Sequence, residues 1–180
     1  MYGIINKAIQ DLVTDNFGAE KWSSVLEKSG IGVDFFISNE AYDDEVTFKL
    51  ALAVADETKL SVGEVLESFG EWWILKTTKE KYGGLLKTGG SSLKEFLINL
   101  PSFHNNIMIL FPKLTPPEFK VSDLQENSIH IHYFSKREGL QEFVKGLLIG
   151  LGKMYESPVE VLLIQSRLTG SDHEIFKVSW

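Results

Sequence analysis

Three polar side chains occupy every second position between Tyr133 and Arg137. If this segment is an extended strand, Tyr133, Ser135 and Arg137 lie on one face, because side chains alternate between the two faces of a strand. That face would present a phenol, a hydroxyl and a guanidinium, which are all hydrogen-bond donors. Because a guanidinium can hold a carboxylate through two parallel bonds, the row predicts a site for a ligand with more than one carboxylate.

A histidine upstream of this row could hold a metal ion. His104 lies in an apolar segment that begins at Pro101, and a neutral imidazole nitrogen is a good ligand for iron. A haem would satisfy both features, since it has two propionates at one edge and an iron that accepts an axial histidine. Both features also have ordinary explanations. A lone histidine on an apolar helix is usually part of the core, and alternating polar residues usually mark the solvated face of an edge strand.

Two other histidines could also hold a metal ion. His130 and His132 share the face of the expected strand opposite Tyr133. Two imidazoles at this spacing could belong to a metal site, but no third ligand is apparent in the sequence. These histidines therefore fit metal ligation less well than His104.

The composition restricts the other classes of function. The chain has 180 residues, a formal net charge of −7 and no cysteine. An acidic chain without a basic stripe is not expected to bind nucleic acid. The lack of cysteine excludes disulfides, thiolate ligation of haem and iron–sulfur clusters. No secretory leader and no apolar run of about 18 residues is present, so we expect a cytoplasmic protein that does not enter the membrane.

The elements that must position these residues indicate an α+β fold in one domain. Helical spacing predicts an N-terminal lobe of helices, whose boundaries are expected near Gly18 and Gly30, from Ser38 to about Glu57, and at a capping box of Ser61 and Glu64. The C-terminal half predicts a helix over 139–155 and strands over 119–124, 129–136, 159–166 and 174–178. We therefore expect a second lobe with a small antiparallel sheet of about four strands and covering helices.

The sequence resembles the H-NOX domain, the haem nitric oxide/oxygen-binding family that includes the sensor domain of soluble guanylate cyclase. The resemblance covers essentially the whole chain and is closest to stand-alone, NO-responsive bacterial members. Its most specific element is the Tyr-x-Ser-x-Arg motif with a histidine upstream. The other matching segments are residues 1–9 and 100–104, Phe69-Gly70-Glu71, Pro116-Pro117 and Gly146-Leu147-Leu148-x-Gly150.

The resemblance implies a single domain over residues 1–180, with a helical distal subdomain at 1–60 and a haem-anchoring subdomain at 61–180. A haem b would lie between the two lobes. His104 would be the proximal ligand of its iron. The propionates would be bound by the three side chains of the motif, which are Tyr133, Ser135 and Arg137.

The resemblance also implies contacts on the porphyrin itself. Ile5 and Pro117 would press on opposite sides of the ring and keep it bent out of plane. A branched aliphatic side chain and a rigid proline are suited to such steric contact. Leu147 belongs to the matching segment on the helix after the motif and is expected at the cofactor as well.

The choice of gas should depend on the distal pocket. Oxygen-binding relatives carry a tyrosine hydroxyl on the helix after the motif, and the corresponding residue here is Phe143. The positions that support this hydroxyl match Ile9 and Trp73. Bound O₂ profits from a donor, whereas Phe143 and Ile9 donate nothing, so we expect NO and CO to bind and O₂ to be excluded. The Trp73 indole could donate into the pocket or could only fill space.

The resemblance implies a haem-based gas sensor and not an enzyme. NO would weaken the bond between iron and His104, and release of this histidine would let the haem relax and the lobes rotate. We expect no catalytic domain in this protein, so the signal would pass to a separate partner, either a histidine kinase or a cyclic-di-GMP enzyme. The alternatives are an O₂ sensor or carrier on the same scaffold, a haem peroxidase and a haem-free interaction module. A peroxidase would need a distal acid/base pair, for which no residue suggests itself.

Overall fold

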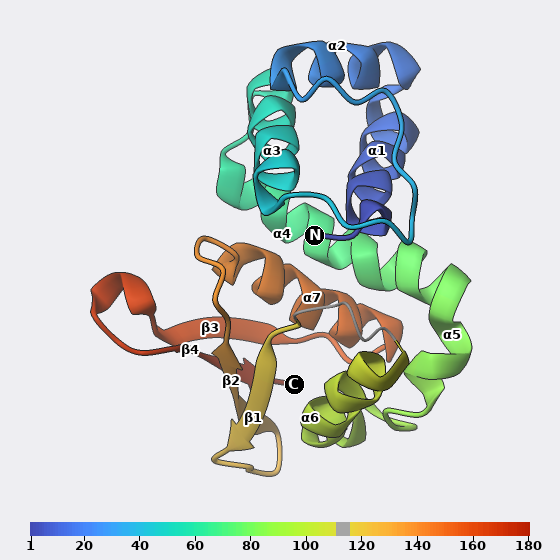
Figure 1. Ribbon diagram of the computed structural model, residues 1–180. Coiled ribbons are helices and arrows are strands. Elements are labelled where there is room, and N and C mark those ends of the chain that lie inside the picture. The colour runs from blue at the N-terminus through green and yellow to red at the C-terminus, as the bar shows by residue number, and fades with distance from the viewer. Residues whose placement is uncertain (111–115) are drawn as a thin grey trace.

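The N-terminal lobe consists of helices around a core of their own (Figure 1). The structure, a computed structural model, describes residues 1–110 and 116–180. The lobe contains α1 (Gly3–Phe17), α2 (Ala19–Ser29), α3 (Asp44–Thr58) and α4 (Val62–Trp72). The expected boundaries at Gly18, Gly30 and Ser61 are confirmed. At the start of α4, the Glu64 N–H donates to Ser61 Oγ at 3.2 Å and the Ser61 N–H donates to the Glu64 carboxylate at 2.8 Å.

The helix expected to begin at Ser38 begins six residues later, at Asp44. The Ile4 N–H donates to the Ser38 carbonyl at 3.1 Å. Tyr2 and Ala41 form an isolated antiparallel bridge in the same region. Segment 38–41 therefore holds the start of α1 in an extended pairing, and its backbone is not available to begin a helix.

The C-terminal lobe carries the antiparallel sheet predicted from the sequence. Its four strands are β1 (Glu118–Ser122), β2 (Ser128–Phe134), β3 (Glu160–Gln165) and β4 (Glu174–Ser179), in the order β1-β2-β4-β3. Its helices are α5 (Lys79–Lys87), α6 (Leu93–Leu110) and α7 (Gln141–Met154), with the π-helix η1 (Trp73–Thr78) before α5 and the short 3₁₀-helix η2 (Arg167–Thr169) before β4. Buried side chains of α6, α7 and all four strands form one core. The α+β fold is therefore confirmed. No helix within the described ranges is long and apolar enough to span a bilayer.

Strand β2 has a buried face and a partly exposed face. Ile129, Ile131 and Tyr133 are buried, whereas the residues between them, including His130 and His132, are partly exposed. The strand expected over 129–136 ends at Phe134, which pairs with Glu118 of β1. Ser135 and Arg137 therefore follow the strand and do not continue its face. The expected row of three donors on one strand is wrong in this respect, although the three residues remain neighbours, as described below.

The two lobes are joined by α4, which lies between the N-terminal helices and α7 (Figure 1). The contact between α4 and α7 requires glycine at two positions. A Cβ atom on Gly146 would lie 2.0 Å from the Glu67 carbonyl oxygen, and one on Gly70 would lie 2.2 Å from the Phe143 carbonyl oxygen. Glycine thus allows the backbones of the two helices to come into contact. This contact explains why glycine is needed at positions 70 and 146, which belong to segments noted in the sequence.

Replacing Gly146 with alanine is expected to destabilise the protein by about 1–3 kcal/mol, because the added methyl group must push α4 away from α7. Gly84 in α5 is a matched control, since a Cβ atom there would meet nothing within 4 Å. Gly84→Ala should leave the stability unchanged or raise it by up to about 1 kcal/mol, because alanine favours the helix. Urea unfolding of the two variants checks this expectation, which equal stability of both would contradict.

Candidate functional site

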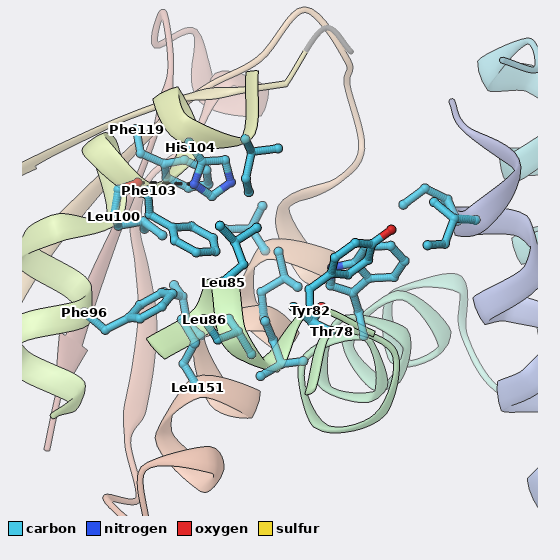
Figure 2. Close-up of a pocket in the computed structure, with 18 of the residues that line it drawn as sticks. Thr78, Tyr82, Leu85, Leu86, Phe96, Leu100, Phe103, His104, Phe119 and Leu151 are labelled. Carbon is cyan, nitrogen blue, oxygen red and sulfur yellow. Dashed lines mark hydrogen bonds between the residues drawn. The ribbon is translucent and has the colours of Figure 1, made fainter. Parts of the chain in front are cut away.

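A cavity of about 250 Å³ lies where the N-terminal lobe meets the C-terminal lobe. Its walls come from α1, η1, α5, α6, β1 and α7, and most of the lining side chains are apolar. Figure 2 shows His104, Phe103, Leu100 and Phe119 grouped on one side of the pocket, away from Thr78 and Tyr82. A cavity between the lobes with one imidazole in an apolar wall can hold a large apolar group that carries a metal.

The imidazole of His104 is prepared for a metal in its neutral form. The helix α6 that carries it contains Pro101 and continues through this residue. His104 Nδ1 lies 3.3 Å from the Leu100 carbonyl oxygen. Nδ1–H can therefore donate to this carbonyl, which leaves the lone pair of Nε2 for a metal. Burial lowers the pKa of His104 to about 4, although the Leu100 carbonyl opposes this shift.

Aromatic rings hold this imidazole in place. The ring centre of Phe119 lies 4.5 Å from that of His104, and Phe103 contacts the same imidazole edge to face at 5.8 Å. Phe119 in turn contacts the Tyr133 ring at 5.5 Å. Rings from α6, β1 and β2 thus form a continuous contact between the imidazole and the first residue of the Tyr-x-Ser-x-Arg motif.

The three residues of this motif form a cluster at the end of β2. The Tyr133 side chain is buried. Burial raises the pKa of Tyr133, although the Ser135 hydroxyl lies near enough to oppose this shift, so the phenol remains protonated and can donate. The Arg137 N–H donates to Ser135 Oγ at 3.0 Å, which closes a local turn. The structure therefore brings the three predicted donors together through a strand end and a turn.

Arg137 connects this cluster to the N-terminal lobe. Its Nε donates to the Asp44 carboxylate at 2.6 Å and its Nη2 donates to the same carboxylate at 3.3 Å. The amino group of Met1 contacts Asp44 at 2.7 Å. Burial alone would raise the pKa of Asp44, but the guanidinium and the amino group hold this pKa below its usual value. Asp44 was not singled out in the sequence, because nothing local indicates a partner 93 positions away.

The predicted cofactor-binding residues divide into two groups. Ile5, Trp73, Leu147 and His104 line the cavity. The other predicted residues are not among its lining residues. The cluster described above contains Tyr133, Ser135 and Arg137. The core of the N-terminal lobe contains Ile9 and Phe143. Pro117 lies directly before β1.

One feature of the cavity was missed in the sequence. The π-helix η1 brings both Trp73 and Thr78 to the cavity, and π-helical turns are frequent at functional sites. An apolar pattern with helical spacing does not distinguish a π-turn from an α-turn, so the sequence carried no signal for η1.

The histidines on the other face of β2 engage neighbouring side chains. His132 contacts Ser122 Oγ at 2.8 Å and His173 at 2.9 Å. His130 Nδ1 lies 3.0 Å from the Asp123 carboxylate. Among the residues that the structure describes, no group of three His, Cys, Asp or Glu side chains is placed to hold a metal ion. This arrangement supports the choice of His104 over the His130 and His132 pair.

Curated proteins similar to this chain include two soluble guanylate cyclases of Caenorhabditis elegans. Soluble guanylate cyclase gcy-32 is 31% identical over 177 residues, which cover 96% of this chain and 26% of that protein. Soluble guanylate cyclase gcy-31 is 28% identical over 165 residues, which cover 91% of this chain and 24% of that protein. The chain thus spans about a quarter of the length of these relatives.

Solved H-NOX structures share the fold at lower identity. An H-NOX protein from S. oneidensis in the Fe(II)NO ligation state has a TM-score of 0.88 and 20% identity, covering 99% of this chain and 98% of that chain. The Fe(II) unliganded H-NOX protein from K. algicida has a TM-score of 0.84 and 24% identity, covering 99% of this chain and 96% of that chain.

The family model described as Haem-NO-binding matches residues 2–163. This match includes the cavity, His104 and the Tyr-x-Ser-x-Arg motif. The chain therefore belongs to the haem-NO-binding family.

Proposed function

We propose that this protein binds haem b in the cavity between its lobes and senses NO, with His104 as the axial ligand of the iron. The observation that carries this proposal is the partly buried imidazole of His104 in the cavity wall. Its Nδ1 is directed to the Leu100 carbonyl and its pKa is lowered to about 4. A ligand nitrogen must be neutral to coordinate iron, and this imidazole is neutral at every physiological pH.

The donor cluster after β2 fits the two propionates of haem. Tyr133 and Ser135 supply hydroxyl groups, and Arg137 supplies a guanidinium that already holds a carboxylate, that of Asp44. A propionate would share the Arg137 guanidinium with the Asp44 carboxylate or would replace this carboxylate. The ion pair of Arg137 with Asp44 joins the turn after β2 to α3 of the N-terminal lobe. Binding of a propionate at the cluster would therefore affect both lobes.

The porphyrin contacts inferred from the family are consistent with the positions of two residues. Ile5 lies in the cavity wall on α1. Pro117 lies directly before β1, the strand that carries Phe119 against His104. We propose that these residues press on opposite sides of the ring, so that motion of α1 relative to β1 would change the shape of the haem.

The proposed gas selectivity rests on the side chains predicted near the bound gas. If haem is bound, its ferrous iron would offer a position for a diatomic gas. Phe143 and Ile9 are apolar parts of the N-terminal lobe core. Ile5 and Leu147 line the cavity without a donor, whereas the hydroxyl groups of Thr78 and Tyr82 lie in the cavity wall away from His104 (Figure 2). NO and CO need no donor, whereas O₂ gains about 1–3 kcal/mol from one. We therefore propose that the protein binds NO and CO and excludes O₂.

The signal would pass through α6. Release of His104 would free this helix from the ligand, and the neighbouring contacts of Phe119 and Tyr133 would transmit the change to the sheet. The output would act on a separate cytoplasmic partner, a histidine kinase or a cyclic-di-GMP enzyme. This role is that of a sensor and not of an enzyme.

His104→Gly supplied with free imidazole is expected to bind haem but to lose the coupling between NO and the protein. The free imidazole can leave the iron without moving α6. Hydrogen exchange of α6, measured with and without NO, should therefore change in the natural protein and not in the variant. His130→Ala is the matched control, because His130 lies on the other face of the sheet. An NO-dependent change that persists in His104→Gly would show that His104 is not the trigger.

Ligation by His104 is expected to survive mild acid. The lowered pKa of this imidazole means that its neutral form persists well below the ordinary value of 6.5. The ferrous absorption spectrum should therefore keep its histidine-ligated form at about pH 5.5, where a solvent-exposed imidazole is mostly protonated. Loss of this form with a midpoint near the ordinary pKa would contradict the buried neutral imidazole.

The ferrous protein in air-equilibrated buffer is expected to form no stable oxygen complex, while NO and CO each change its absorption spectrum. Absorption spectra recorded for the three gases check this directly. The alternative function is an O₂ sensor or carrier that uses the Trp73 indole as donor, since Trp73 lines the cavity. A stable oxygen spectrum that disappears in Trp73→Phe would establish this alternative instead.

A further inference from the structure

The side chain of Arg167 binds the backbone of the turn that carries Ser135 and Arg137. Arg167 lies in η2, between β3 and β4. Its Nη1 donates to the Ser135 carbonyl at 2.8 Å and its Nη2 donates to the Arg137 carbonyl at 2.5 Å. A single guanidinium therefore binds the backbone on both sides of Lys136, where the sheet ladder has already ended.

A buried carboxylate fixes this guanidinium. Arg167 Nε lies 2.9 Å and 3.1 Å from the two carboxylate oxygens of Glu174. The Glu174 side chain is only 3% exposed, so its charge requires a cation beside it. Glu174 is the first residue of β4 and lies directly opposite Tyr133 in the sheet. The ion pair thus anchors the guanidinium beside the one motif residue that belongs to a strand.

Only arginine can make this set of contacts. Its planar guanidinium presents donors in a rigid fork, so one side chain can reach a carboxylate and two carbonyls together. A lysine could neutralise Glu174 but has no fork to span the two carbonyls. All three nitrogens of Arg167 are bonded to the protein, so this residue is placed to hold the turn and not to bind a ligand carboxylate itself.

We propose that Arg167, fixed by Glu174, is a positioning residue for the carboxylate-binding cluster. It holds the turn after β2 so that Ser135 and Arg137 stay beside Tyr133 although neither lies in the strand. This inference rests on the proposed function, in which the cluster binds the haem propionates. The binding geometry of the propionates would then depend on Arg167, which lies 30 positions beyond Arg137 and would not contact the propionates itself.

The test compares iron protoporphyrin IX with its dimethyl ester, which has the same ring but no carboxylates. The dissociation rate of each from the reconstituted protein is measured with a haem scavenger. In the natural protein the ester should dissociate about ten times faster or more, because hydrogen bonds to a charged group are lost. Arg137→Ala should reduce this ratio and serves as the reference for loss of direct binding.

Arg167→Ala should reduce the ratio at least severalfold toward that of Arg137→Ala, although Arg167 does not touch the carboxylates. Arg167→Lys keeps the charge beside Glu174 but lacks the fork, so it should behave like Arg167→Ala while disturbing folding less. Lys145→Met is the matched control, because it removes an ion pair with Glu67 on the contact between α4 and α7, away from the turn. Its ratio should equal that of the natural protein.

The role of Arg167 is overturned if Arg167→Ala or Arg167→Lys releases both porphyrins faster with an unchanged ratio, since a merely structural clamp would act on both alike. It is also overturned if Arg167→Lys keeps the natural ratio, because charge alone would then suffice. A natural protein that binds no haem, or that holds the ester as well as the acid, would contradict the proposed function and this inference together.

Discussion

The proposed site depends on one imidazole in the wall of the cavity between the lobes. His104 sits in the cavity wall with its Nδ1 turned to the Leu100 carbonyl, so that a neutral Nε2 is available. An imidazole whose Nδ1 is fixed by a carbonyl is oriented to coordinate a metal through Nε2. The two lobes, the aromatic contacts of α6 and the donor cluster after β2 are all arranged around this residue.

The sequence predicted those parts of the fold that depend on local chemistry. Gly18 and Gly30 marked helix ends because glycine adopts the backbone angles required there, and Ser61 with Glu64 marked a helix start through mutual hydrogen bonds. The alternation of apolar residues placed the four strands. The family motifs gave the site residues, of which Ile5, Trp73, Leu147 and His104 line the cavity.

The features that the sequence did not predict depend on contacts between distant residues. Ser38 does not begin a helix because its carbonyl accepts from Ile4, and β2 ends at Phe134, where its partner strands begin with Glu118 and Glu174. The ion pair of Asp44 with Arg137 joins residues from different lobes. None of these partners is recognisable from its own neighbourhood. The donor row was thus predicted with the right residues and the wrong geometry, since a turn and not a strand brings them together.

The resonance Raman spectrum of the ferrous, gas-free protein reconstituted with haem tests directly whether His104 coordinates the iron. We expect a vibration of the bond between iron and imidazole that shifts when histidine is labelled with ¹⁵N. This vibration should be absent from His104→Ala and unchanged in His132→Ala, whose imidazole lies on the far face of the sheet. A protein that takes up no haem, or one whose iron–imidazole vibration survives in His104→Ala, would contradict coordination of the iron by His104.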